Sequence, residues 1–138
     1  MALMANGGAA YAVRSWSFLP STADIATARN QVADFVAANG HPARCEDVRL
    51  MVSELVTNAF VHASSPCQVT VTVTGPSLRV DVSDSSRDNP TLQPPSLTEV
   101  NGRGLFIVQA LATIWGVSSH DGGKTVWFEL AESASVPG

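Results

Sequence analysis

The spacing of hydrophobic residues changes along the first half of the chain. Residues 11–18 alternate bulky with small or polar side chains, which is typical of a half-buried strand. Over residues 22–39, and again over residues 43–62, apolar residues recur every three or four positions, which predicts two amphipathic helices. Gly40 separates the two helices, because glycine readily adopts the left-handed conformation that ends a helix.

The second half of the chain returns to alternation. Two alternating runs on either side of Gly75-Pro76-Ser77 predict a β-hairpin that ends at Asp84. Residues 85–103 have no period and contain three prolines, so we expect a long loop, and loops of this length in compact domains are often functional lids. A third helix is expected over residues 104–114, followed by a closing hairpin across residues 121–123.

These elements predict a single domain over residues 11–131. Its fold class is an α/β two-layer sandwich, in which three helices cover one face of a mostly antiparallel, mixed sheet. Residues 1–10 are small and rich in glycine and alanine, and we expect them, like residues 132–138, to form a flexible tail.

Composition limits the classes of function. The chain has 138 residues, 45% of them hydrophobic and 14% charged, as in a soluble globular domain. Its net charge of −4 provides no field that would attract a nucleic acid. The chain has no basic leader and no apolar run of membrane-spanning length, so we expect a cytoplasmic protein without a membrane partner. Cys45 and Cys67 lie outside any CxxC motif, and we expect free thiols.

Two polar residues, Glu54 and Asn58, interrupt the apolar second helix. They are four positions apart and therefore project from the same face. A carboxylate can accept a proton from a nucleophile, and an amide oxygen beside it is a good ligand for a hard cation, so the pair suits metal-assisted phosphoryl transfer. A solvated helix face would produce the same pattern, and these two residues alone do not decide between the two interpretations.

Two other segments have features of a nucleotide site. Gly102 and Gly104 flank Arg103 just before the expected third helix, where free backbone N–H groups can bind an anion. A plain turn before a helix would look the same. Asp84 ends a strand, where its carboxylate could accept a hydrogen bond from the amino group of a base such as adenine, or could simply begin a turn.

A third segment, Gly123-Lys124-Thr125, ends like a phosphate-binding loop. The first glycine of that motif would fall at position 118, which is Ser118, and the segment leads into a strand rather than a helix. We therefore exclude a Walker motif.

Four short motifs occur along the chain in the order ELVTNAFVHA, VDVSD, GRGLFIVQALATIWGV and GGKTVWFEL. Together with the long lid before the third, they resemble the GHKL (Bergerat-fold) ATP-binding superfamily over about residues 15–131. Within it the chain is most similar to small stand-alone regulators of the anti-sigma factor, serine-protein kinase group. The resemblance implies ATP and Mg²⁺ as cofactors, a sigma factor and an anti-anti-sigma (STAS-domain) protein as partners, and a homodimer as a common assembly.

The resemblance also implies roles for three residues of the first two motifs. Glu54 corresponds to the general base of the family, and Asn58 corresponds to the ligand of Mg²⁺, between the metal and the phosphates. Asp84 corresponds to the acid that accepts a hydrogen bond from the adenine amino group.

In the last two motifs, Gly102 and Gly104 correspond to the glycines around the triphosphate, and Thr125 resembles a hydroxyl on the adenine side. Arg103 is not a motif position, but its place between the glycines predicts a phosphate contact. The wider superfamily has glycines after the adenine-reading acid, whereas this chain has Ser85-Ser86.

Two functions from different classes follow. In the first, ATP and Mg²⁺ bind under the lid and Glu54 deprotonates a serine or threonine of a partner, so that an anti-sigma factor with kinase activity regulates transcription by partner switching. In the second, a catalytically silent module sequesters a sigma factor with weak or no nucleotide turnover, which the Ser85-Ser86 departure favours. A detached histidine-kinase catalytic domain is a weaker third interpretation, because no dimerisation helix with an acceptor histidine precedes these motifs.

Overall fold

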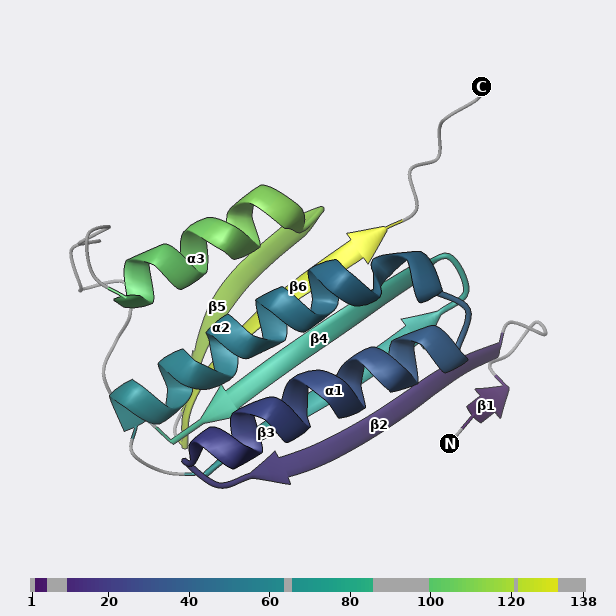
Figure 1. Cartoon of the computed structure of the whole chain (residues 1–138). Coiled ribbons are helices and arrows are strands. Elements are labelled where there is room, and N and C mark those ends of the chain that lie inside the picture. The colour runs from purple at the N-terminus through teal and green to yellow at the C-terminus, as the bar shows by residue number, and fades with distance from the viewer. Residues whose placement is uncertain (1, 5–9, 64–65, 86–99, 121, 132–138) are drawn as a thin grey trace.

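The chain folds into two layers, with helices on one face of a sheet (Figure 1). The structure is a computed structural model that describes residues 2–4, 10–63, 66–85, 100–120 and 122–131. In chain order its elements are β1 (Ala2–Met4), β2 (Ala10–Phe18), α1 (Thr22–Ala38), the short 3₁₀ helix η2 (Pro42–Arg44), α2 (Cys45–Ala63), β3 (Cys67–Thr74), β4 (Ser77–Asp84), α3 (Val100–Leu111), β5 (Ile114–His120) and β6 (Gly123–Ala131).

The sheet has six strands in the order β1-β2-β3-β4-β6-β5. Each strand is antiparallel to its neighbours, so the sheet is antiparallel throughout the described residues. Helices α1, α2 and α3 lie over the same face, with α2 between the other two (Figure 1). The predicted α/β two-layer sandwich is therefore confirmed.

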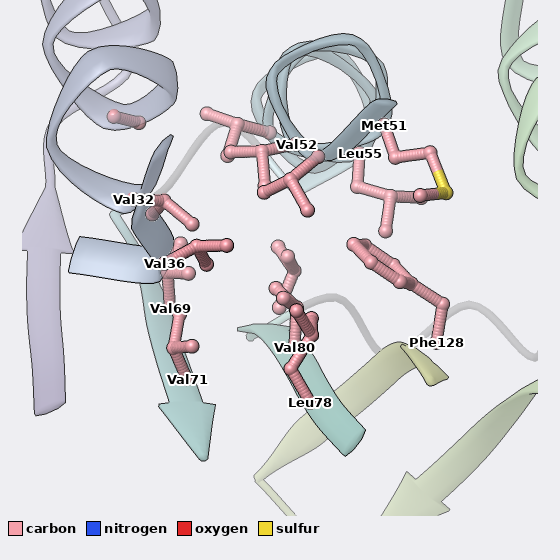
Figure 2. Close-up of a cluster of buried hydrophobic side chains, with 14 of the residues drawn as sticks. Val32, Val36, Met51, Val52, Leu55, Val69, Val71, Leu78, Val80 and Phe128 are labelled. Atoms are coloured by element: carbon pink, nitrogen blue, oxygen red, sulfur yellow. The ribbon is translucent and has the colours of Figure 1, made fainter. Parts of the chain in front are cut away.

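The helix-facing side of the sheet is almost entirely apolar, because alternate residues of each strand point to the same face. Val71 of β3 pairs with Val80 of β4, which pairs in turn with Phe128 of β6. Each such side chain contributes roughly 1.5–3 kcal/mol when it is fully buried. Figure 2 shows this layer packed against residues of α1 and α2, namely Val32, Val36, Met51, Val52 and Leu55.

The ends of α1 match the sequence prediction and have clear causes. The Ser21 hydroxyl accepts a hydrogen bond from the Asp24 N–H at 3.1 Å, and the Asp24 carboxylate accepts one from the Leu19 N–H at 2.7 Å, so donors near the helix start are satisfied. At the other end Gly40 has φ of +101°, the left-handed conformation that lets the chain turn into η2.

Element boundaries differ from the sequence prediction most clearly in three places. Residues 2–4, expected in an N-terminal tail, pair with β2 as strand β1. Helix α3 begins at Val100, four residues before the expected start at Gly104, and so takes in the end of the predicted lid. Ile114, expected at the end of that helix, begins β5.

Parts of the predicted lid and tails, residues 5–9, 86–99 and 132–138, lie outside the described residues. The described part of the chain contains no helix that combines the length and the apolar character needed to cross a membrane.

The start of β6 lies unusually close to the end of β4. Gly123 has φ of +147°, and a Cβ atom at this position would lie 1.9 Å from the Asp84 carbonyl oxygen and 2.7 Å from the Ser85 Cα. Both contacts are to backbone, which cannot move aside as a flexible side chain can. Only glycine fits there without a shift of the strand ends.

We therefore expect Gly123→Ala to lower the free energy of unfolding by at least about 2 kcal/mol, through steric overlap and an unfavourable φ. Urea denaturation followed by circular dichroism measures the change. The matched control is Gly122→Ala, because the nearest atom to a Cβ there is His120 Nδ1 at 4.0 Å. The control should stay within about 0.5 kcal/mol of the native protein. Equal stability of the two variants would contradict the close approach.

Candidate nucleotide site

Glu54 and Asn58 lie on the side of α2 that is turned away from α1. Arg49 of α2 donates a hydrogen bond from Nη1 to the Asn30 side chain of α1, which identifies the α1 side of the helix. Asn58 follows Arg49 by about two and a half helical turns and therefore points to the opposite side. Since α2 lies between α1 and α3, the Glu54 and Asn58 face is turned toward α3 (Figure 1).

Asn58 has a buried oxygen that finds no partner among the residues that the structure describes. The residue is half-buried, and its Oδ1 atom is fully buried and accepts no hydrogen bond among the described residues. A buried polar atom left in this state costs roughly 1–3 kcal/mol and is rare in folded proteins. An amide oxygen is a ligand that Mg²⁺ accepts. The oxygen that would bind the cation is thus the one left unpaired, so this residue fits the metal-ligand role.

Glu54 is half-buried one turn before Asn58. Among the described residues its carboxylate takes part in no hydrogen bond and no ion pair. A general base needs a carboxylate that can reach an incoming hydroxyl, and a carboxylate held by a nearby arginine or lysine would be a poorer one. Glu54 has no such contact within the described part of the chain, and both this and its position suit the role of a general base.

Asp84 occupies the last helix-facing position of β4. It continues the buried alternation of Leu78, Val80 and Val82, and its side chain is only 3% exposed. Its cross-strand neighbour on β6 is Lys124, whose Nζ lies 3.4 Å from Asp84 Oδ2. A charge at this depth is tolerated when an opposite charge accompanies it. The carboxylate predicted to read adenine is therefore buried, and a lysine lies beside it.

Cys67 begins β3 close to the same carboxylate. Burial, with smaller contributions from the nearby Asp84 and Asp24 carboxylates, raises the pKa of the Cys67 thiol to about 12. Both cysteines are free, as predicted from their spacing. The negative charge of Asp84 thus acts on the Cys67 thiol of β3 and on the Lys124 ammonium group of β6.

Thr125 lies on the wrong side of the sheet for the role that the resemblance implied. Its neighbours Lys124 and Val126 face the helices, so Thr125 faces away from them. There its hydroxyl forms hydrogen bonds with Ser83 Oγ at 2.7 Å and with His120 Nε2 at 3.2 Å. The sheet separates Thr125 from the Asp84 carboxylate, and Lys124 holds the position beside that carboxylate.

Lys124 is the site residue that the sequence interpretation missed. In the sequence it stands within the segment that resembles, but does not match, a Walker motif. The alternation along β6 could have identified it: Phe128 and Leu130 face the core, and Lys124 lies an even number of residues from both and so faces the same side.

The glycine pair lies inside α3 rather than before it. Because α3 begins at Val100, Gly102 falls in the first turn, where backbone N–H groups have no partner within the helix. Gly104 falls beyond the first turn, where an N–H normally bonds to the carbonyl four residues earlier. The N–H of Gly102 therefore lies where a helix start can bind an anion, whereas the N–H groups of Arg103 and Gly104 lie where helical hydrogen bonds begin.

The elements that carry these residues meet at one end of the sandwich. In Figure 1 the C-terminal half of α2, the end of β4 and the start of α3 all lie at the left end, and the register places the start of β6 beside the end of β4. The geometry therefore groups Glu54 and Asn58 on the helical layer with Asp84 and Lys124 on the sheet layer.

A second feature lies on the opposite, helix-free face. A depression there is lined by Thr72, Thr74, Ser77, Leu78, Arg79, Asp81 and Glu129. The Arg79 guanidinium lies 3.0 Å from Asp81 and 3.2 Å from Glu129, and it stacks over the Trp127 ring. Because its charge is already satisfied and the sheet intervenes, this depression is not part of the candidate nucleotide site.

Comparison with known families identifies the domain in which these residues lie. The family model described as the histidine kinase-like ATPase domain matches residues 18–130, which include all four residues of the candidate site. None of the curated proteins compared with the chain matches it.

We expect Asn58→Leu to leave the unliganded protein as stable as the native one, or to stabilise it by up to about 2 kcal/mol, because an unsatisfied buried oxygen is removed and leucine favours a helix. Thermal and urea unfolding measure this change. The control is Asn30→Leu on α1, which loses the hydrogen bond from Arg49 and should gain less. A clear destabilisation by Asn58→Leu would show that Oδ1 has a partner in the folded protein.

We expect iodoacetamide to alkylate the half-buried Cys45 well before Cys67 at pH 8, since the raised pKa of Cys67 keeps it protonated and only the thiolate reacts. Peptide mass spectrometry over a time course distinguishes the two sites. Because the folded pKa exceeds that of an unfolded thiol, the associated stability is present at neutral pH and is lost between about pH 9 and pH 12. Cys67→Ala should lack that part of the pH dependence, and equal labelling rates would contradict the prediction.

Proposed function

Because the chain belongs to the histidine kinase-like ATPase domain family, we propose that it is an ATP-dependent kinase that phosphorylates a serine or threonine of a partner protein. The observation that carries this proposal is the pair on α2: within the described part of the chain, the buried amide oxygen of Asn58 has no hydrogen-bond partner and the carboxylate of Glu54, one turn away, makes no polar contact. Metal-assisted phosphoryl transfer uses a ligand for a hard cation and, close to it, a base that accepts a proton from the attacking hydroxyl group.

In the proposed reaction Glu54 accepts the proton of the partner's hydroxyl group. The hydroxyl oxygen forms a bond to the γ-phosphorus of ATP, the bond from that phosphorus to the bridging oxygen breaks, and ADP leaves with the electron pair. Asn58 Oδ1 would hold Mg²⁺, which supplies neutralisation of phosphate charge when bound. Asp84 would accept a hydrogen bond from the adenine amino group, and the backbone around Gly102 would donate to phosphate oxygens.

For the partners, we propose a STAS-type anti-anti-sigma protein as phosphate acceptor and a sigma factor as the protein that this chain holds. Phosphorylation of the acceptor would then decide which partner is bound, and transcription would be regulated in the cytoplasm without a direct contact to nucleic acid. The proposal rests on the resemblance of the four sequence motifs to regulators of this group, as does a homodimeric assembly.

One observation favours a second candidate function, a silent module that sequesters a sigma factor. Asp84 already has Lys124 at 3.4 Å, and the residues that follow Asp84 are serines rather than the glycines of the wider superfamily. If the ion pair and the serines close the base end of the site, the domain would bind its partner without nucleotide turnover. Titration with Mg·ATP separates the two candidates, because the silent module would give little or no binding heat.

We expect Glu54→Gln to lower phosphate transfer by about 10²–10⁴-fold while Mg·ATP affinity stays within a few-fold, since the amide cannot accept the proton but keeps the size of the side chain. Transfer of labelled γ-phosphate to candidate STAS proteins and calorimetric titration measure the two quantities. The matched control is Glu46→Gln, an exposed carboxylate in the first turn of the same helix, which should transfer at the native rate.

Full transfer by Glu54→Gln would remove Glu54 from the role of base. Binding of Mg·ATP by the native protein, with no transfer to any serine or threonine, would favour the sequestering module over the kinase.

A further inference from the structure

Lys124 is half-buried beside the carboxylate that is assigned to the base of the nucleotide, although no motif assigns it a role. Its side chain is 11% exposed, and its Nζ lies 3.4 Å from Asp84 Oδ2. It reaches this place because β6 starts directly against the end of β4, at the close approach of Gly123 to the Asp84 backbone. Lysine side chains are seldom withdrawn this far from solvent without an opposite charge, and Asp84 provides that charge.

The pair presents two different hydrogen-bonding groups side by side toward the helical layer. A carboxylate accepts hydrogen bonds only, and an ammonium group donates three. Within the described part of the chain Asp84 is the one ion-pair partner of Lys124, so one N–H can stay on the carboxylate while another donates elsewhere. A ligand edge with a donor beside an acceptor would satisfy both residues together.

The Watson–Crick edge of adenine is such an edge, with the amino group at N6 beside the acceptor N1. We propose that Lys124 is a specificity-determining residue of this site, which donates a hydrogen bond to adenine N1 while Asp84 accepts one from the amino group. The inference rests on the proposed ATP-binding function and adds a second, charge-assisted contact to the single carboxylate that the family resemblance implies.

In this arrangement the ion pair between Lys124 and Asp84 is kept when adenine binds. If adenine had to displace Lys124 from Asp84, an ammonium that is largely shielded from water would lose its counter-charge, which is unfavourable. With the base bridging the two groups, both stay charged and both stay satisfied. Guanine has the opposite order, with an acceptor at O6 and a donor at N1, so it would have to exchange the two partners.

The test compares nucleotide analogues on two variants of equal charge. The analogue 1-deaza-ATP lacks only the N1 acceptor, and the triphosphate of purine riboside lacks only the amino group. Lys124→Gln keeps an N–H donor without the positive charge, whereas Lys124→Met has neither. Calorimetry or competition with a fluorescent nucleotide gives the affinities, and thermal unfolding identifies any variant that does not fold.

We expect the native protein to bind ATP about tenfold or more tightly than 1-deaza-ATP, the difference of a lost hydrogen bond to a charged donor. Lys124→Gln should retain part of this preference, since it keeps a neutral donor, and Lys124→Met should reduce it to about one. Both variants should still discriminate against the purine riboside triphosphate, because that preference depends on Asp84.

An unchanged preference for ATP over 1-deaza-ATP in Lys124→Met would overturn the inference and leave Lys124 as a counter-charge for Asp84 only. The same conclusion follows if the native protein binds ATP and 1-deaza-ATP equally, and tighter binding of GTP than ATP would overturn the assigned order of contacts. If the native protein binds neither ATP nor any analogue, the proposed kinase function fails as well, so the two failures are distinguishable.

Discussion

The fixed register between β3, β4 and β6 is the constraint on which the rest of the molecule depends. Side chains alternate along a strand, so a slip of one residue would turn every core valine toward solvent and every surface threonine toward the helices. The pairing of Val71 with Val80 and of Val80 with Phe128 prevents such a slip, since each residue is completely buried. The same register decides that Asp84 and Lys124 face the helices and that Thr125 does not.

The apolar layer ends in polar groups at one edge, and this junction determines what the domain can bind. Along β4 the helix-facing positions are Leu78, Val80 and Val82, and the last helix-facing position of the strand is Asp84. On α2 the core residue Leu55 lies directly next to Glu54, and Ala59 directly next to Asn58. Since polar groups in such a place weaken the core, their presence at facing ends of two layers points to a ligand that interacts with them.

Much of the fold was predictable because the strongest sequence signals are local. Helices α1 and α2 and the β3-β4 hairpin were placed within a few residues, from long periodic runs and a Gly-Pro turn whose glycine has φ of +60°. The start of α3 was misplaced because Gly102 and Gly104 have low helix propensity, which tertiary packing of α3 against α2 overrides. Strand β1 was missed because three residues are too short a run to show alternation, and their pairing with β2 is not visible in the sequence. In the site, the position of Asp84 followed from the strand pattern, whereas the neighbour of Asp84 required the pairing of two strands 40 residues apart in sequence.

The two ends of the candidate site differ in the contacts that their polar groups make before a ligand binds. At Asn58 a buried oxygen has no partner among the described residues, so a cation bound there adds a contact without removing one. At Asp84 the carboxylate already has Lys124, so a base gains from that end only if it contacts both groups. Groups held in place before binding lose little conformational entropy on binding, which favours recognition by a fixed pair over recognition by a mobile single residue. Under the proposed function, a chain without the glycines after Asp84 could still recognise a base, because the β4-β6 register already holds Lys124 in place beside the carboxylate.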